Sequence, residues 1–168
     1  MNSMNPRYEL LQRLRNYTEE AIHFKPSAEA WSICQVTDHC LAVAHEYLDA
    51  AEACQEATGD SADSKTAFGA ELFERGEFPT IKITLPPDMN QPPNNSLLRA
   101  ELEAELVNLT VRMDEVEKKV VSIPATNRVK HDGFGWLNAS EWYALVDMHF
   151  RHHERQFSEL EQSLKGGS

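Results

Sequence analysis

Helical periodicity in residues 96–121 constrains the fold of this chain more than any other sequence feature. Apolar side chains recur there every three or four positions over about seven turns, which is typical of a helix with one buried stripe. The stripe consists of Leu98, Leu102, Leu106, Leu109, Met113, Val116 and Val120. Such a stripe must be covered by other elements, and we find no alternating strand pattern that would supply a sheet. The sequence therefore predicts an all-α protein.

Three further segments show the same periodicity and are predicted to be helices. They are residues 6–23, 31–54 and 138–164. Ser32 with Gln35, and Asn138 with Glu141, have the spacing of a capping box, in which two side chains satisfy free backbone N–H groups at a helix start. These pairs predict where the second and fourth helices begin.

Residues 59–95 break the helical pattern and contain most of the prolines. We expect a short helix at 70–76 and an extended piece at 80–85, and we interpret 128–135 as a glycine-bearing loop. A connection this long crosses between distant elements or lines a site. Four amphipathic helices with one long crossover between the second and third predict a four-helix bundle.

The two ends of the chain complete the predicted domain organisation. Residues 1–164 are expected to form a single domain, because a chain of 168 residues supports one continuous core. The last four residues, KGGS at 165–168, are interpreted as a remnant of an expression tag.

Composition excludes several classes of partner. The chain has 16 Lys and Arg against 27 Asp and Glu, a net charge of -11, whereas nucleic acids and anionic membranes are bound by clustered positive charge. No apolar run approaches the roughly 20 residues of a membrane span, and no signal peptide is recognisable, so a cytoplasmic location is expected. The odd number of cysteines, three, favours reduced thiols over disulfides.

Two histidines of the predicted 138–164 helix fall in its apolar stripe. At about 100° per residue, and with His149 as the reference, Trp142 and Leu160 lie near +20° and His153 near +40°. His152 lies near -60°, at the edge of the stripe. The helix therefore points two imidazoles, one turn apart, toward the core.

Buried imidazoles need partners for both ring nitrogens, and their charged form is costly to bury. No acidic residue lies on the stripe, but one divalent metal ion could accept His149 and His153 together, since i, i+4 spacing lets two rings converge. His39, on the buried face of the 31–54 helix, could supply a third ligand. Three protein ligands leave a coordination position open, as catalytic metal sites do. The alternative, on these grounds, is that the histidines are ordinary hydrogen-bonded core residues.

Two blocks of sequence resemble the DinB/YfiT-like superfamily of metalloenzymes. The first is WSICQVTDHC at 31–40, with a histidine eight residues after the tryptophan, and the second is HDGFGWLNASEWYALVDMHFRHHERQF at 131–157. The second block is similar to the ending of one uncharacterised DinB-like branch, and ERGEFPTIKITLP at 74–86 resembles its crossover segment. Asp132 departs from the proline that this branch has after the histidine.

The resemblance implies a four-helix bundle with a long connection between helices two and three, which in this superfamily is often a homodimer. It also implies a metal site made of His39, His149 and His153, occupied by zinc or nickel. His152 and Gln156 are expected as polar neighbours of the site, and no catalytic residue is assigned.

Characterised members of the superfamily are S-transferases or isomerases that use bacillithiol, mycothiol or glutathione. The resemblance therefore implies an S-transferase whose partners are a low-molecular-weight thiol and a small electrophile. Two alternatives stay open at this point. One is a non-catalytic, stress-associated metal-binding protein, and the other is a metal-dependent hydrolase.

Overall fold

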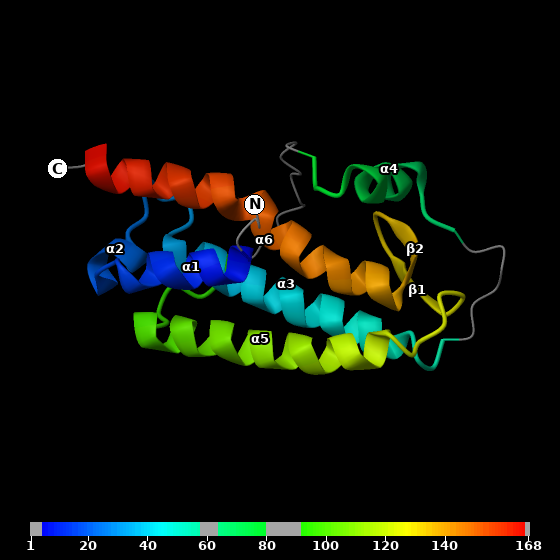
Figure 1. Cartoon of the computed structure of the whole chain (residues 1–168). Coiled ribbons are helices and arrows are strands. Elements are labelled where there is room, and N and C mark those ends of the chain that lie inside the picture. The colour runs from blue at the N-terminus through cyan, green and yellow to red at the C-terminus, as the bar shows by residue number, and fades with distance from the viewer. Residues whose placement is uncertain (1–4, 58–63, 80–91, 167–168) are drawn as a thin grey trace.

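The fold was analysed in a computed structural model that describes residues 5–57, 64–79 and 92–166 (Figure 1). The helices are α1 (Pro6–Arg15), α2 (Glu19–His23), α3 (Ile33–Ala53), α4 (Ala67–Arg75), α5 (Arg99–Val120) and α6 (Ala139–Gly166). Two short strands, β1 (Arg128–His131) and β2 (Gly135–Asn138), form an antiparallel hairpin. The protein is thus mostly helical.

The long helices form a bundle around α3. This helix lies between α6 and α5, and α1 packs against both α5 and α6 (Figure 1). The largest fully buried side chains are Phe150, Leu14, Ile22, Ile33, Leu48, Leu102, Leu106, Leu109, Met113, Leu137, Leu145 and Val36. Full burial of each such side chain contributes about 1.5–3 kcal/mol relative to exposure. The predicted four-helix bundle with a long connection between its second and third long helices is confirmed.

The predicted apolar stripe of α5 is buried except at its first position. Leu98 is 53% exposed, because the helix begins at Arg99 rather than at residue 96. The carboxylate of Glu101 accepts the Leu98 N–H at 3.1 Å, which satisfies one of the free donors at this helix start.

The predicted capping boxes are both present. Ser32 Oγ accepts the Gln35 N–H at 3.1 Å, and Gln35 Oε1 accepts the Ser32 N–H at 2.9 Å. Asn138 and Glu141 exchange the same pair of bonds, each at 2.9 Å. The starts of α3 and α6, which carry the candidate site, therefore follow from local sequence.

The prediction of one continuous helix over residues 6–23 was wrong. The chain leaves helical geometry after Arg15, and Thr18 adopts an extended conformation, with its hydroxyl accepting the Ala21 N–H at 3.1 Å. Threonine is a favoured N-cap, so it starts the separate helix α2. Periodicity could not show this break, because Tyr17 packs against the same core as the helix before it.

The prediction of a loop at 128–135 was also wrong, because this segment contains β1 and the first residue of β2. His131 pairs with Gly135 across the turn, and Gly135 has a positive φ of 84°. A β-carbon there would lie 2.6 Å from the backbone nitrogen of Thr66, so only glycine fits. Strands of four residues are too short to show alternation in the sequence.

Helix α4 confirms the short helix expected within the long connection, although it begins earlier than predicted. Two hydrogen bonds hold its N-terminus against the hairpin. The Thr66 N–H donates to Phe134 O at 2.9 Å, and the Thr66 hydroxyl donates to Gly133 O at 2.9 Å. Gly69 touches the hairpin so closely that a β-carbon would lie 2.2 Å from Phe134 O. The extended piece expected at 80–85 lies outside the described residues.

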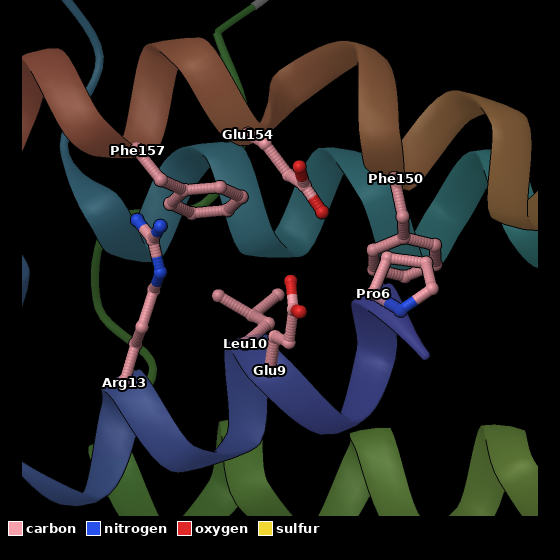
Figure 2. Close-up of a pocket in the computed structure, with 7 residues that line it drawn as sticks. All are labelled: Pro6, Glu9, Leu10, Arg13, Phe150, Glu154 and Phe157. Atoms are coloured by element: carbon pink, nitrogen blue, oxygen red, sulfur yellow. The ribbon is translucent and has the colours of Figure 1, made fainter. Parts of the chain in front are cut away.

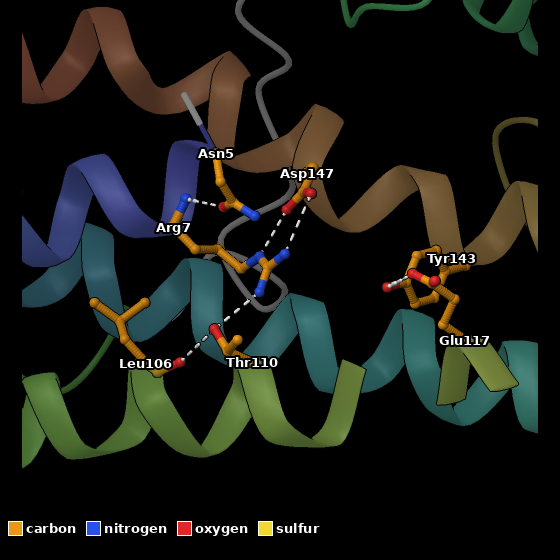
Figure 3. Close-up of polar contacts among 7 residues, drawn as sticks. All are labelled: Asn5, Arg7, Leu106, Thr110, Glu117, Tyr143 and Asp147. Atoms are coloured by element: carbon orange, nitrogen blue, oxygen red, sulfur yellow. Dashed lines mark hydrogen bonds and ion pairs between the residues drawn. The ribbon is translucent and has the colours of Figure 1, made fainter. Parts of the chain in front are cut away.

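A buried arginine joins three helices of the bundle (Figure 3). Arg7 of α1, whose side chain is 8% exposed, donates from Nε to Asp147 of α6 at 2.8 Å. Its Nη1 donates to the Thr110 hydroxyl of α5 at 2.9 Å. The guanidinium thus holds α1 in register with α5 and α6.

None of the described helices is both long and apolar enough to cross a bilayer.

Candidate metal centre

Three histidines from two helices meet inside the bundle. His39 belongs to α3, whereas His149 and His153 lie one turn apart on α6. One ligand nitrogen of each ring lies within 4.8 Å of those of the other two. The ring centroids are 5.0 Å apart for His39 and His149, 5.1 Å for His39 and His153, and 4.6 Å for His149 and His153.

The connection before α5 fixes the end of α3 that carries His39. The Asn94 N–H donates to the Asp38 carboxylate at 3.2 Å, and the Gln35 amide donates to Pro93 O at 3.1 Å. These bonds hold residues 92–98 against the first turns of α3. They also occupy the carboxylate that lies next to His39 in the sequence.

The two histidines of α6 face each other through the same ring atom. His153 Nε2 lies 3.2 Å from His149 Nε2, while His153 Nδ1 lies 2.8 Å from Oε1 of Gln156. An amide oxygen only accepts, so the Nδ1 of His153 carries its proton and the Nε2 presents a lone pair to the site. Metal-binding histidines commonly have such a partner on the second nitrogen.

The donor set fits a divalent cation. Two nitrogens 3.2 Å apart match neighbouring ligands of one tetrahedral ion, for which metal–nitrogen bonds of about 2.0–2.1 Å are usual. His149 is 9% exposed, and its Nδ1 has no hydrogen-bond partner among the described residues. Because this ring lacks an ordinary set of core hydrogen bonds, the three-histidine cluster is compatible with a divalent metal.

Burial keeps all three imidazoles uncharged at neutral pH. Burial, together with the neighbouring histidines, lowers the pKa of His149 to about 2. Burial also lowers the pKa of His153 to about 4, and it lowers the pKa of His39. Neutral imidazole is the form that binds metal ions.

The metal-free protein is expected to lose stability as the pH falls from 7 toward 5. The imidazoles of His149 and His153 titrate near 6.5 in the unfolded chain but far lower in the folded protein. Below about 6.5 the unfolded chain therefore binds protons that the folded protein does not, and acid favours unfolding. Thermal unfolding in excess chelator at pH 7.5, 6.5 and 5.5 measures this loss. A His153→Asn variant should lose less, and an unchanged pH dependence in that variant would contradict the assignment.

Aromatic rings surround the histidines. Trp31 lies 5.4 Å from His39, measured between ring centroids, and Phe78 lies 5.8 Å from His149. Tyr47, two turns after His39 on α3, meets His149 edge-on at 6.1 Å. The cluster is therefore enclosed on several sides by apolar surface, which strengthens electrostatic interactions inside it.

The remaining candidate residues have different positions. Gln156 contacts His153, as described above. His152 is exposed, and its ring lies 5.5 Å from Phe78 and 5.1 Å from His153. It therefore stands at the edge of the cluster and is not among the three histidines whose ligand atoms converge.

A separate cavity between α1 and α6 shares no lining residue with the three histidines (Figure 2). Its volume of about 10 Å³ has room for about one water molecule. The carboxylates of Glu9 and Glu154 point toward each other there (Figure 2), and burial together with Glu9 raises the pKa of Glu154. We assign this cavity no part in the candidate site.

The fold and the site together define a helical-bundle protein with a three-histidine centre compatible with a divalent metal. Comparison with known families gives the class a name, since the DinB superfamily model matches residues 6–157. The chain belongs to the DinB superfamily. Comparisons with curated proteins and with solved structures gave no match.

Several residues beside the histidines were missed as site residues in the sequence. Tyr47 was placed only on the buried face of its helix, although it follows His39 by eight residues on the same side. Phe78 and Phe134 lie outside the bundle helices, so helical periodicity could not identify them. They lie near the site because hydrogen bonds hold α4 against the hairpin.

Proposed function

We propose that the protein is a metal-dependent S-transferase that joins a low-molecular-weight thiol to a small electrophile. One observation carries the proposal, namely that His39, His149 and His153 converge as neutral imidazoles with no carboxylate among them. Three neutral ligands leave a divalent ion with its full charge, and three protein ligands leave room for a further molecule.

In this proposal each candidate residue has a role. His39, His149 and His153 hold the ion, Gln156 orients His153, and His152 is a polar neighbour at the edge. When bound, the ion acts as a Lewis acid that lowers the pKa of a thiol or a water molecule. Imidazole is a good ligand for both zinc and nickel, so the ligand type does not distinguish between the two metals.

The reaction is a substitution or an addition at carbon. The thiol loses its proton to solvent, and its sulfur forms a bond to the electrophilic carbon. In a substitution, the bond to the leaving group breaks and its electron pair departs with that group. In an addition, the electron pair of the π bond moves to the neighbouring atom, which takes a proton from solvent. The rings around the cluster exclude water and pack against the apolar part of the electrophile. The homodimer expected from the resemblance stays a prediction.

A thiol is favoured over water as the nucleophile because no carboxylate that could act as a general base belongs to the described three-histidine cluster. A hydrolase needs a group that removes a proton from water. Asp38 and Glu154 are next to candidate ligands in the sequence, but Asp38 accepts a backbone N–H and Glu154 lines the separate cavity between α1 and α6. A hydrolase would therefore depend on the metal ion alone to activate the attacking water molecule.

The protein loaded with zinc or nickel is expected to conjugate at least one of glutathione, bacillithiol and mycothiol to 1-chloro-2,4-dinitrobenzene. The rate should fall to the uncatalysed level with chelator and in His39→Ala, because the nucleophile is then no longer activated. Absorbance of the thioether product measures the rate. His45→Ala is the matched control, since His45 lies on the same helix and accepts a hydrogen bond from Arg112 instead.

Three other outcomes would overturn the transferase proposal. Conjugation that persists after chelation would mean that the centre is not involved. Metal-dependent hydrolysis of model esters without any conjugation would identify a hydrolase. Stoichiometric metal that raises thermal stability, without turnover of any thiol or ester, would favour a non-catalytic metal-binding protein.

A further inference from the structure

Tyr47 is a buried residue whose hydroxyl has no hydrogen-bond partner among the described residues. Its side chain is 9% exposed, yet no hydrogen bond reaches the hydroxyl from the residues that the structure describes. Buried tyrosine hydroxyls usually have a partner. Aromatic side chains on a helix lean toward its N-terminus, so the Tyr47 hydroxyl lies toward the turn of α3 that carries His39. Since the Tyr47 ring lies 6.1 Å from that of His149, its hydroxyl is a donor near the histidine cluster that is unpaired within the described residues.

His131 presents a second donor next to Tyr47. Its Nδ1 accepts the Gly133 N–H at 2.9 Å and the Phe134 N–H at 3.1 Å, so the proton of the neutral ring is on Nε2. No hydrogen bond from this Nε2 occurs within the described part of the chain. The ring of His131 lies 6.3 Å from that of Tyr47.

These two donors belong to a closed series of ring contacts that includes one of the candidate ligands. The centroid distances are 6.1 Å for Tyr47 and His149, 5.8 Å for His149 and Phe78, 5.7 Å for Phe78 and Phe134, 4.0 Å for Phe134 and His131, and 6.3 Å for His131 and Tyr47. We call these five residues the ring circuit. The circuit is apolar apart from its donors and the imidazole of His149.

The charges that act on the three histidines favour a neutral ligand. Among the described groups that shift their pKa values, Asp38 is the one carboxylate, and no lysine or arginine contributes. An anionic ligand would therefore find no charged partner on the described surface of the site except the metal ion itself.

We propose that the Tyr47 hydroxyl, with His131 Nε2–H beside it, donates a hydrogen bond to an acceptor oxygen of the electrophile. The ring circuit packs against the rest of the molecule. The substrate class is a neutral, apolar electrophile with a carbonyl or ether oxygen. The chemical assignment rests on the proposed function, whereas the binding role of Tyr47 can be tested without turnover.

The test compares acetophenone with ethylbenzene, which has a similar shape but no acceptor oxygen. NMR titration of the zinc-loaded protein is expected to show acetophenone binding up to about 10-fold more tightly, the range of one net hydrogen bond. Tyr47→Phe should reduce this preference below about 2-fold. Tyr143→Phe is the matched control, because its hydroxyl donates to Glu117 at 3.0 Å and should leave the preference unchanged.

Further measurements separate the possible causes of a preference. The preference for acetophenone should persist in chelated wild-type protein. If chelation abolishes the preference, the metal causes it and the proposal is overturned. The proposal is also overturned if Tyr47→Phe keeps the preference or if the wild type shows none. The thermal midpoint of Tyr47→Phe should equal or exceed that of the wild type, and a clear decrease would show that the hydroxyl is structural. If conjugation fails while the preference holds, the transferase proposal falls and the binding role stands.

Discussion

The variants His39→Ala and His153→Ala are expected to retain less than about one tenth of the stoichiometric divalent metal bound by the wild type. Each removes one of the three nitrogens that converge in the described part of the chain, and two imidazoles bind far more weakly than three. Elemental analysis of untagged protein, purified without chelator and dialysed against metal-free buffer, measures the metal per chain.

His152→Ala is the matched control for this measurement. His152 directly precedes His153 on α6, but its exposed ring is not among the three histidines whose ligand atoms converge. Its removal should leave the metal content unchanged. Full metal content in both His39→Ala and His153→Ala would refute the ligand assignment, and equal loss in His152→Ala would show that the effect is not specific to the three histidines.

Gln156→Ala extends the same prediction to the residue that orients His153. Loss of an oriented partner on the second imidazole nitrogen typically weakens metal binding by about 10–100-fold. The variant should therefore bind metal at saturation but lose it in competition with a moderate chelator. Unchanged affinity would mean that the contact between Gln156 and His153 does not hold the ring in its binding orientation.

Asp147→Ala is expected to lower the free energy of unfolding by about 3 kcal/mol, the largest stability effect that we expect from a single polar contact in this fold. Removal of the carboxylate leaves the buried guanidinium of Arg7 with one side-chain partner among the described residues, the neutral Thr110 hydroxyl (Figure 3). Breaking a buried pair in this way costs about 3–5 kcal/mol, and the lower value applies because the Asp147 side chain is 26% exposed. Urea denaturation measures the change.

Two comparisons make this test specific. The double variant Arg7→Met with Asp147→Leu should recover most of the loss, because apolar residues of similar volume often replace a buried ion pair without cost. Glu159→Ala, which breaks the exposed pair with Arg155, should change stability by less than about 1 kcal/mol. A small effect of Asp147→Ala, comparable with that of Glu159→Ala, would mean that Arg7 finds other partners.

Helical periodicity accounts for most of what could be predicted about the fold. The stripes of α3, α5 and α6 are long enough to establish both the helix type and the buried face, and the capping pairs mark two of the helix starts. The same reasoning failed where the signal is short. Thr18 starts the separate helix α2 through one hydroxyl, and the hairpin strands have four residues each, too few for any period to show.

The candidate site, like the fold, could be predicted only in part from the sequence. The directions of His149 and His153 follow from their spacing on one helix, so the sequence by itself determined that these imidazoles point inward. Only the tertiary structure decided that His39 meets them and that rings from the hairpin and the long connection surround the cluster. Periodicity is a property of one segment, whereas these contacts depend on how separate segments pack together.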